Sequence, residues 1–369
     1  MKKIITICLL LTVFTLNTFA QLNTVPDGGN KKASVSEKIG ITDVNIHYDR
    51  PGVKGREGKI WGQLVHLGFA DLGFGSSKAA PWRAGANEST TIEFSTAVKI
   101  EGQDLPAGKY SFFIAYDPNE STLIFSKNNT AWGSYFYKES EDALRVKAKP
   151  VSLDKSVEWL KYEFMNETEN SATIALQWEK LMIPFKVEVD IIKTQLESFR
   201  KELQGEKGFT WQTWDQAARW CLQHNTNLEE ALKWTDSSTS NGFPGEKNFQ
   251  SLSTRAQLMD KLGRAAEAET VMKEAMPLAN MQQLHQYGRQ LLQQKKNKEA
   301  LEVFKINLAK NPNQFTTLMG ITRGYSANGD YKSALKTAKQ ALPLAPSGQN
   351  KTFVEDAIKK LEAGKDINN

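Results

Sequence analysis

The sequence predicts a multidomain α+β protein, in which an N-terminal antiparallel β-sandwich or barrel precedes a C-terminal all-α solenoid of paired helices. Three observations lead to this prediction. Up to about residue 190, apolar residues alternate with polar ones, as in half-buried strands, and beyond residue 191 they recur with the period of an amphipathic helix. In the C-terminal part, alanine and proline then recur at a fixed interval, as in a helical-repeat array. At 369 residues, the chain is also longer than a typical single domain.

The first twenty residues are expected to form a cleavable signal peptide. Lys2 and Lys3 precede an apolar run over residues 4–14, and a small-x-small cleavage site ends at Ala20. That apolar run is too short to span a membrane. We therefore expect a protein that is exported to the periplasm or secreted, without a transmembrane span, and a flexible lead-in over residues 21–32.

Composition narrows the class of partner. The chain has 47 basic and 42 acidic residues without blocks of like charge, which argues against nucleic acid as a partner. One of its two cysteines, Cys8, lies in the expected signal peptide, so no intramolecular disulfide is expected in the exported chain. The other, Cys221, lies on an apolar helical stretch and is interpreted as a core residue rather than a nucleophile.

Residues 33–190 are expected to form the β-rich domain. Period-two alternation recurs in seven short segments: 44–48, 110–114, 123–125, 144–146, 160–164, 174–178 and 181–189. Residues typical of turns separate several of them, as at 101–104, 117–119 and 166–170. Because no helical pattern intervenes, the strands should form an antiparallel sandwich or barrel. Pro184 predicts that the last strand lies at a sheet edge, since proline has no N–H to donate.

Five ordered motifs in this domain carry a resemblance. They are His47–Pro51 followed by Lys54–Arg56, then Trp82–Glu88, Leu105–Ser111, Trp132–Tyr135 and Asp142–Val146. Together they resemble the bacterial family known as domain of unknown function 2911, from about Ala33 to Asp190. The resemblance implies a β-rich exported protein, and it implies no established activity.

The C-terminal part begins with a connecting helix and linker over residues 191–208, and repeats are expected over residues 209–369. Ala300 and Ala334 are separated by 34 residues, as are Pro312 and Pro346; Ala266 lies 34 residues before Ala300, and Ala231 lies 35 before Ala266. This period resembles that of tetratricopeptide repeats, although Leu284 and Leu318 replace the family's usual tryptophan. The resemblance implies a protein or peptide partner on a concave face.

Candidate catalytic residues cluster in sequence near residues 81–88, a Gly/Ala-hinged stretch with several polar side chains. His47 is a candidate general base, oriented by Asp49 or Glu88. The alternative is that His47 is a surface or network histidine, because neighbouring charges alone do not select catalysis. The β domain holds only two histidines, His47 and His66, without metal-ligand spacing, so no metal and no cofactor is expected.

Candidate ligand-binding residues are mainly cationic: Arg50, Arg56, Trp82, Arg83, Asn87, Glu88 and Arg145. Arginine forks suit carboxylate or phosphate, so an anionic ligand is one interpretation. In the alternative, Asp49, Glu88 and Asp142 pair with the arginines and brace the loops. Trp82 could stack on a sugar ring, or it could fill the end of the sandwich.

The leading functional hypothesis is an exported, non-catalytic binding protein. The repeats would dock a protein or peptide partner, and the β domain would hold an anionic or carbohydrate-like ligand. The alternative is a hydrolase-type enzyme in which His47 acts as base while Arg83 and Asn87 stabilise an oxyanion. The alternative requires His47, Asp49, Arg83 and Glu88 to converge in one cleft. A third hypothesis has the β domain cap the solenoid or form an oligomer.

Overall fold

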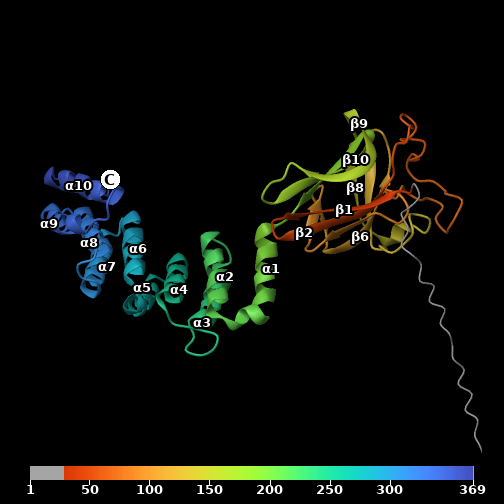
Figure 1. Cartoon of the computed structure of the whole chain (residues 1–369). Helices are drawn as coiled ribbons and strands as arrows, with labels where there is room; N and C mark the ends of the chain where they lie inside the picture. Colours follow the sequence, from red (N-terminus) through yellow and green to blue (C-terminus); the bar gives the residue numbers. More distant parts are fainter. Residues whose placement is uncertain (1–28, 369) are drawn as a thin grey trace, which may run out of the picture. The chain divides into compact units, whose positions relative to one another are not determined.

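The computed structural model describes residues 29–368, which form two compact units with a boundary between Thr194 and Gln195. Figure 1 shows strands in the first unit and helices in the second. The expected signal peptide lies outside the described residues, and so does most of the expected lead-in. The lead-in ends earlier than expected, because Lys31 and Lys32 already belong to the first strand. In its ladder, they lie opposite Arg50 and Asp49 of the second strand.

The first unit is a sandwich of two open antiparallel sheets. One has the order β1-β2-β3-β6-β7-β8, formed by β1 (Lys31–Ile39), β2 (Thr42–Arg50), β3 (Thr91–Phe94), β6 (Gly108–Ala115), β7 (Ser121–Ser126) and β8 (Asp142–Ala148). The other has the order β5-β4-β10-β9, formed by β4 (Val98–Ile100), β5 (Gln103–Leu105), β9 (Val151–Met165) and β10 (Ser171–Glu188). Both sheets have free edges. Of the two predicted alternatives, the structure therefore has the sandwich and not the barrel.

The core lies between the two sheets. Phe112 of β6 and Phe125 of β7 meet Phe185 of β10, with ring centroids 5.4 and 6.0 Å apart. A second aromatic group joins Trp82 and Trp61 to Trp178, which is 1% exposed. Burial of these large rings supplies the apolar area that stabilises the sandwich.

The prediction that Pro184 marks an edge strand is wrong. Residues 174–178 and 181–189 do not form two strands; apart from residue 189 they belong to β10, an interior strand with a register shift around Glu179. The pairing of β10 with β9 runs to Met182, and its pairing with β4 begins at Val187. Pro184 lies between these two paired parts, where its missing N–H is tolerated.

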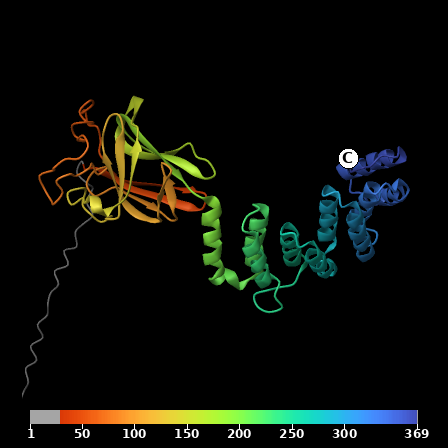
Figure 2. The ribbon, with the colours of Figure 1, turned by 180° about the vertical axis from the view of Figure 1, so that it is seen from behind.

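The second unit consists of helix pairs, as predicted. After α1 (Ile191–Leu203), the pairs are α2 (Trp211–Gln223) with α3 (Leu228–Ser238), α4 (Phe249–Lys261) with α5 (Ala265–Ala275), α6 (Met281–Gln293) with α7 (Asn297–Lys310), and α8 (Phe315–Ala327) with α9 (Tyr331–Ala341). The helix α10 (Gln349–Glu362) packs on α9. Figure 2 shows these helices following one another as an array. Short 3-10 turns lie at Glu139–Glu141, Glu206–Phe209, Met276–Leu278 and Leu342–Leu344.

The repeat register differs from the prediction at one alanine. Ala231, Ala300 and Ala334 are fully buried, and each is the fourth residue of the second helix of its pair. Ala266 is exposed, and Ala268 takes the equivalent buried position in α5. The reason is that the stretch from Ala268 to the start of α6 is two residues shorter than the stretch from Ala300 to the start of α8.

Candidate functional site

Residues 81–88 form a tightly held segment of the β domain. Ala84 and Asn87 have positive φ values of 50° and 56°, a conformation that non-glycine residues seldom adopt. The carbonyl of Ala84 accepts hydrogen bonds from the hydroxyls of Thr90 and Tyr162, at 3.1 and 2.7 Å. Such strained backbone is typical of functional sites, and here it places Glu88 next to β2.

Gly85 explains how the segment approaches β2 so closely. A Cβ atom at this position would lie 2.7 Å from the Thr90 hydroxyl oxygen and 3.1 Å from the carbonyl oxygen of Asp49. The close approach thus requires glycine.

A buried carboxyl group, Asp49, and the carboxyl group of Glu88 form the centre of the site. Lys32 on β1 bridges them: its ammonium nitrogen lies 2.7 Å from Oε1 of Glu88 and 3.6 Å from Oδ2 of Asp49. The three side chains line a pocket of about 290 Å³ together with His47, Tyr48, Ala33 and Ser89. Asp49 Oδ1 and Glu88 Oε2 are buried, and no N–H group or hydroxyl of the described residues donates a hydrogen bond to either atom.

The two carboxyl groups have opposite pKa shifts. Burial raises the pKa of Asp49, and the hydrogen bond with Glu88 raises it further. The ammonium group of Lys32 lowers the pKa of Glu88 to about 2, and the hydrogen bond with Asp49 acts in the same direction. Glu88 is therefore the more acidic group of the pair, and with this pKa it is a weak base at neutral pH.

This asymmetry predicts the pH dependence of an Asp49→Asn variant. A raised native pKa gives a stabilising contribution that is full below the unfolded pKa of 3.8 and is lost as the pH rises through the native pKa. Asparagine does not ionise, so the free energy of unfolding of Asp49→Asn should rise relative to wild type between about pH 4 and pH 7. Chemical unfolding across this pH range measures the difference.

Asp43→Asn is the matched control for this experiment, because Asp43 lies on the same strand with its side chain 50% exposed. The prediction would be contradicted if the free energies of unfolding of Asp49→Asn and wild type differed by a constant amount across the pH range.

The four residues that the hydrolase hypothesis requires do not all converge. His47, Asp49 and Glu88 line one pocket, with His47 exposed on β2. Arg83 does not line this pocket: its Nη1 donates to the carbonyl oxygen of Asn87 at 2.7 Å, and its guanidinium group lies 5.0 Å from the ring centroid of Tyr135. Within residues 29–368, Arg83 has no carboxylate partner.

The remaining candidate ligand-binding residues are dispersed. Arg50 donates to the carbonyl oxygen of Leu160 at 2.8 Å, and Arg56 donates to that of Gly52 at 2.7 Å, so both brace loops against the backbone. Trp82 is buried and packs on Trp178 in the core. These positions present no common surface to an anionic ligand.

Arg145 lies in a different pocket of about 350 Å³, formed by Phe69, residues 76–79, Tyr137 and Glu139. Its Nε donates to Oδ2 of Asp142 at 2.6 Å, and its Nη2 donates to the Tyr137 hydroxyl at 2.5 Å. Burial raises the pKa of Tyr137, so this hydroxyl stays protonated and donates to Asp142. The predicted pairing of Asp142 with an arginine is therefore present, whereas Asp49 and Glu88 pair with Lys32.

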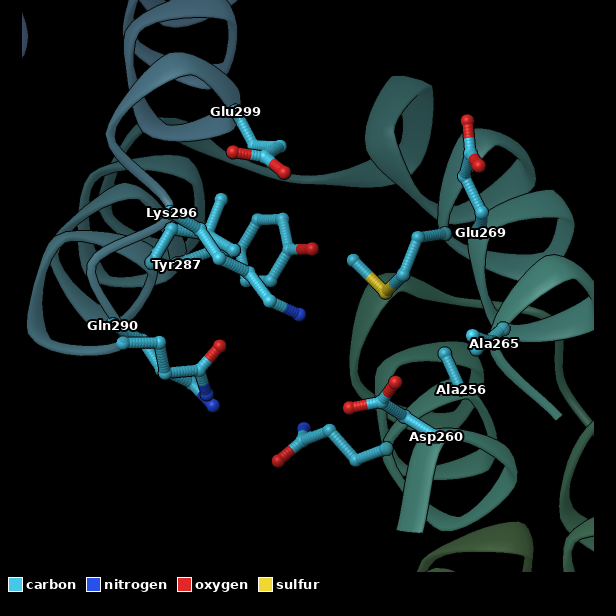
Figure 3. Close-up of a pocket in the computed structure, with 13 residues that line it drawn as sticks. Ala256, Asp260, Ala265, Glu269, Tyr287, Gln290, Lys296 and Glu299 are labelled. Atoms are coloured by element: carbon cyan, nitrogen blue, oxygen red, sulfur yellow. The ribbon is translucent and has the colours of Figure 1, made fainter. Parts of the chain in front are cut away.

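The helical unit has its own cavity, a cleft of about 390 Å³ between the pairs α4–α5 and α6–α7 (Figure 3). The side chains of Tyr287 and Lys296 reach into it from one side, and that of Asp260 faces them from α4. Along the array, α7 packs closely on α8 and α3 on α4, whereas α5 and α6 approach each other at few backbone positions. The looser contact leaves room for the cleft.

Lys32 and the residues of the helical cleft were not predicted from the sequence. Lys32 lies among polar residues with no pattern of its own, and its partners are 17 and 56 positions away in sequence. The cleft arises from imperfect packing between two helix pairs, and no local sequence motif predicts such a gap. The irregular spacing of the earlier repeat units is the one sequence feature that could have indicated looser packing there.

Solved structures similar to this chain are helical-repeat proteins. "MamA 41-end from Desulfovibrio magneticus RS-1" is 20% identical, covers 43% of this chain and 92% of its own, and has a TM-score of 0.28. A putative kinesin light chain from Podosopora anserina, with nearly identical TPR-like repeats, is 14% identical (42% of this chain, 85% of its own, TM-score 0.31). YrrB, "a TPR protein with an unusual peptide-binding site", is 15% identical, covers 45% of this chain and 85% of its own, and has a TM-score of 0.30.

No curated protein matches the chain. The family described as "Protein of unknown function (DUF2911)" matches residues 30–187, which include all ten strands of the described sandwich apart from the last residue of β10. The N-terminal domain of this chain is therefore similar to the DUF2911 family over residues 30–187.

Proposed function

We propose that this chain is an exported, non-catalytic binding protein whose helical repeats dock a basic segment of a partner protein. The cleft between α4–α5 and α6–α7 carries this proposal, because it is the largest cavity described above and interrupts an array of a type that commonly binds peptides. Its volume of about 390 Å³ accommodates one or two side chains of a docked peptide.

The charges of the cleft define the kind of segment that fits. Three acidic residues, Asp260, Glu269 and Glu299, line it, against one basic residue, Lys296. Glu269 is paired with Lys273 at 2.7 Å, while Asp260 and Glu299 have no ion-pair partner within the described part of the chain. The acidic excess favours a lysine or arginine of the partner.

The walls of the cleft add an apolar requirement. Met272, Leu291 and three alanines line it together with the ring of Tyr287. Burial raises the pKa of Tyr287, and the charges of Glu299 and Asp260 raise it further, so its hydroxyl remains a neutral hydrogen-bonding group. We infer that the preferred segment carries an apolar residue next to a basic one.

Charge reversal in the cleft tests this function. Peptides selected from a random display library against the full chain should be enriched in lysine or arginine beside an apolar residue. The double variant Asp260→Lys/Glu299→Lys should bind a selected peptide at least about 10-fold more weakly in titration calorimetry, equivalent to about 1.4 kcal/mol.

Glu355→Lys is the matched control, since this exposed residue of α10 lies outside the cleft. Selected peptides that are acidic, or that bind the double variant as tightly as wild type, would refute the proposed docking.

Export is the second part of the proposal, and it is supported by the basic start, apolar run and small-x-small site of residues 1–20. Among residues 29–368, none of the helices combines the length and apolar composition that a membrane crossing needs. N-terminal sequencing of the protein from its host should begin at Gln21. A sequence that begins at Met1 would contradict export by this route.

A catalytic role for the β domain is not part of the proposal. His47, Asp49 and Glu88 do share a pocket, but Lys32 keeps the pKa of Glu88 near 2 and so removes its strength as a base. Arg83 is also absent from this pocket, and the ammonium group of Lys32, which lines it, is already paired with Glu88 and Asp49. An anionic ligand is equally disfavoured at a pocket centred on two carboxyl groups.

A further inference from the structure

Two loops of the β domain, residues 69–80 and 132–137, pack together and expose aromatic side chains. Phe69, Phe74 and Phe136 are 41%, 64% and 44% exposed, and the rings of Phe74 and Phe136 are 6.0 Å apart. Exposed apolar groups gathered in this way are typical of a recognition surface.

The contact between the loops is tight. The backbone N–H of Ser77 donates to the carbonyl oxygen of Tyr135 at 2.9 Å. Gly75 has a φ of +78°, and a Cβ atom there would lie 2.3 Å from the same carbonyl oxygen. The pocket beside this contact is therefore a built feature of the domain with fixed walls.

This pocket, of about 350 Å³, combines one aromatic face with several polar groups. Phe69 supplies the ring. Ser77 lines the pocket, and its hydroxyl has no hydrogen-bond partner among residues 29–368, although the residue as a whole is only 6% exposed. A polar ligand in the pocket can therefore form a hydrogen bond with this hydroxyl.

Arg145 is a prearranged donor at the same pocket. Asp142 and Tyr137 hold its Nε and Nη2, so the guanidinium plane is fixed. Its Nη1 lies 3.0 Å from Glu139, whose side chain is 78% exposed and free to yield this position to a ligand. Fixed donors lose little entropy on binding.

The charges around the pocket balance. Lys78 is paired with Asp71 at 3.0 Å, and Arg145 is paired with Asp142 and Glu139. A ligand with a net charge of either sign gains little here, whereas a neutral ligand rich in hydroxyl groups can satisfy Ser77, Arg145 and Glu139 together. A pyranose ring offers such hydroxyl groups at its edge and C–H groups on its face for the ring of Phe69.

We propose that the pocket lined by Phe69, Ser77, Glu139 and Arg145 binds a neutral saccharide, with one sugar ring seated on Phe69. The volume lies at the small end of ligand sites, about 300–1,000 Å³, and so fits a single sugar residue of a longer chain. This site is separate from the helical cleft and does not depend on the partner proposed for it.

The test uses the full chain and a set of neutral trisaccharides: maltotriose, cellotriose, N,N′,N″-triacetylchitotriose and xylotriose. Titration calorimetry should detect binding of at least one of them. Phe69→Ala and Ser77→Ala should each weaken that binding about 10-fold, because the first removes the ring on which the sugar is seated and the second removes a hydrogen-bond partner of the sugar. The cleft variant Asp260→Lys/Glu299→Lys should bind the same sugar as wild type does, which keeps the two proposals separable.

Phe74→Ala is the matched control, because this exposed ring lies on the same loop and does not line the pocket. Unchanged thermal unfolding of each variant shows that the fold is intact, and any variant that fails this check is replaced by Glu139→Gln, which alters an exposed side chain of the pocket. Absence of binding to all four sugars overturns the proposal. It is also overturned if Phe74→Ala weakens sugar binding as much as Phe69→Ala does. Binding to phosphatidylcholine–phosphatidylglycerol vesicles in place of sugar, lost in Phe74→Ala, also overturns it and identifies a membrane-contact surface.

Discussion

Replacing Phe304 by alanine is expected to lower the free energy of unfolding of the helical unit by about 3–5 kcal/mol. Phe304 on α7 is 1% exposed. Its ring lies so close to the backbone of α6 and α8 that a Cβ atom at Gly288 or Gly320 would approach it to 2.5 or 2.7 Å. The ring thus fills a space that three helices share, and truncation leaves a cavity that rigid helix backbones cannot close.

Urea unfolding followed by helical circular dichroism measures this loss. Phe243→Ala serves as the control, because Phe243 is 80% exposed in the loop between α3 and α4 and should change stability by no more than about 0.5 kcal/mol. A loss below about 1 kcal/mol in Phe304→Ala would show that the described packing of α6, α7 and α8 is incorrect.

Trp82→Ala is expected to lower the free energy of unfolding of the β domain by a similar amount, about 3–5 kcal/mol. The indole of Trp82 is 8% exposed, and its centroid lies 5.5 Å from that of Trp61 and 6.1 Å from that of Trp178. Removal of one ring from this group loses buried area and aromatic contacts together. The result separates the two interpretations of Trp82, because a ligand-facing indole would contribute little to stability in the free protein.

Unfolding followed by tryptophan fluorescence and near-ultraviolet circular dichroism provides the measurement. Trp132→Ala is the matched control, since this indole is 55% exposed and should alter stability by about 0.5 kcal/mol or less. Equal effects of the two substitutions would mean that Trp82 is not part of the core.

Local patterns were enough to predict the architecture. Val44, Ile46 and Tyr48 alternate with polar residues, which predicts that one face of the strand is buried, because successive side chains of a strand point to opposite faces. All three side chains are buried in β2. The buried alanines Ala300 and Ala334 likewise report the close approach of two helices in each pair. The physics behind both signals lies within one element or one pair of elements.

Features that depend on distant segments were harder to predict. Pro184 gave a sound local signal, yet β10 changes its pairing partner along its length and accommodates the proline between two ladders. Ala266 and Ala268 differ only in register, which the length of the following connection decides. Arg50 and Arg56 donate to backbone carbonyl groups, and Lys32, from the segment expected to be a lead-in, pairs with the carboxyl groups of Asp49 and Glu88.

Site-specific photo-crosslinking tests the central claim, the docking of a basic segment in the helical cleft, most directly. A photo-reactive residue at Gln290, which lines the cleft, is compared in the producing cells with one at Gln349, an exposed position of α10. Peptide mass spectrometry then locates the attachment site on the partner. We expect crosslinks from Gln290, and none from Gln349, to a segment with lysine or arginine beside an apolar residue. Equal crosslinking from both positions, or attachment to an acidic segment, would contradict it.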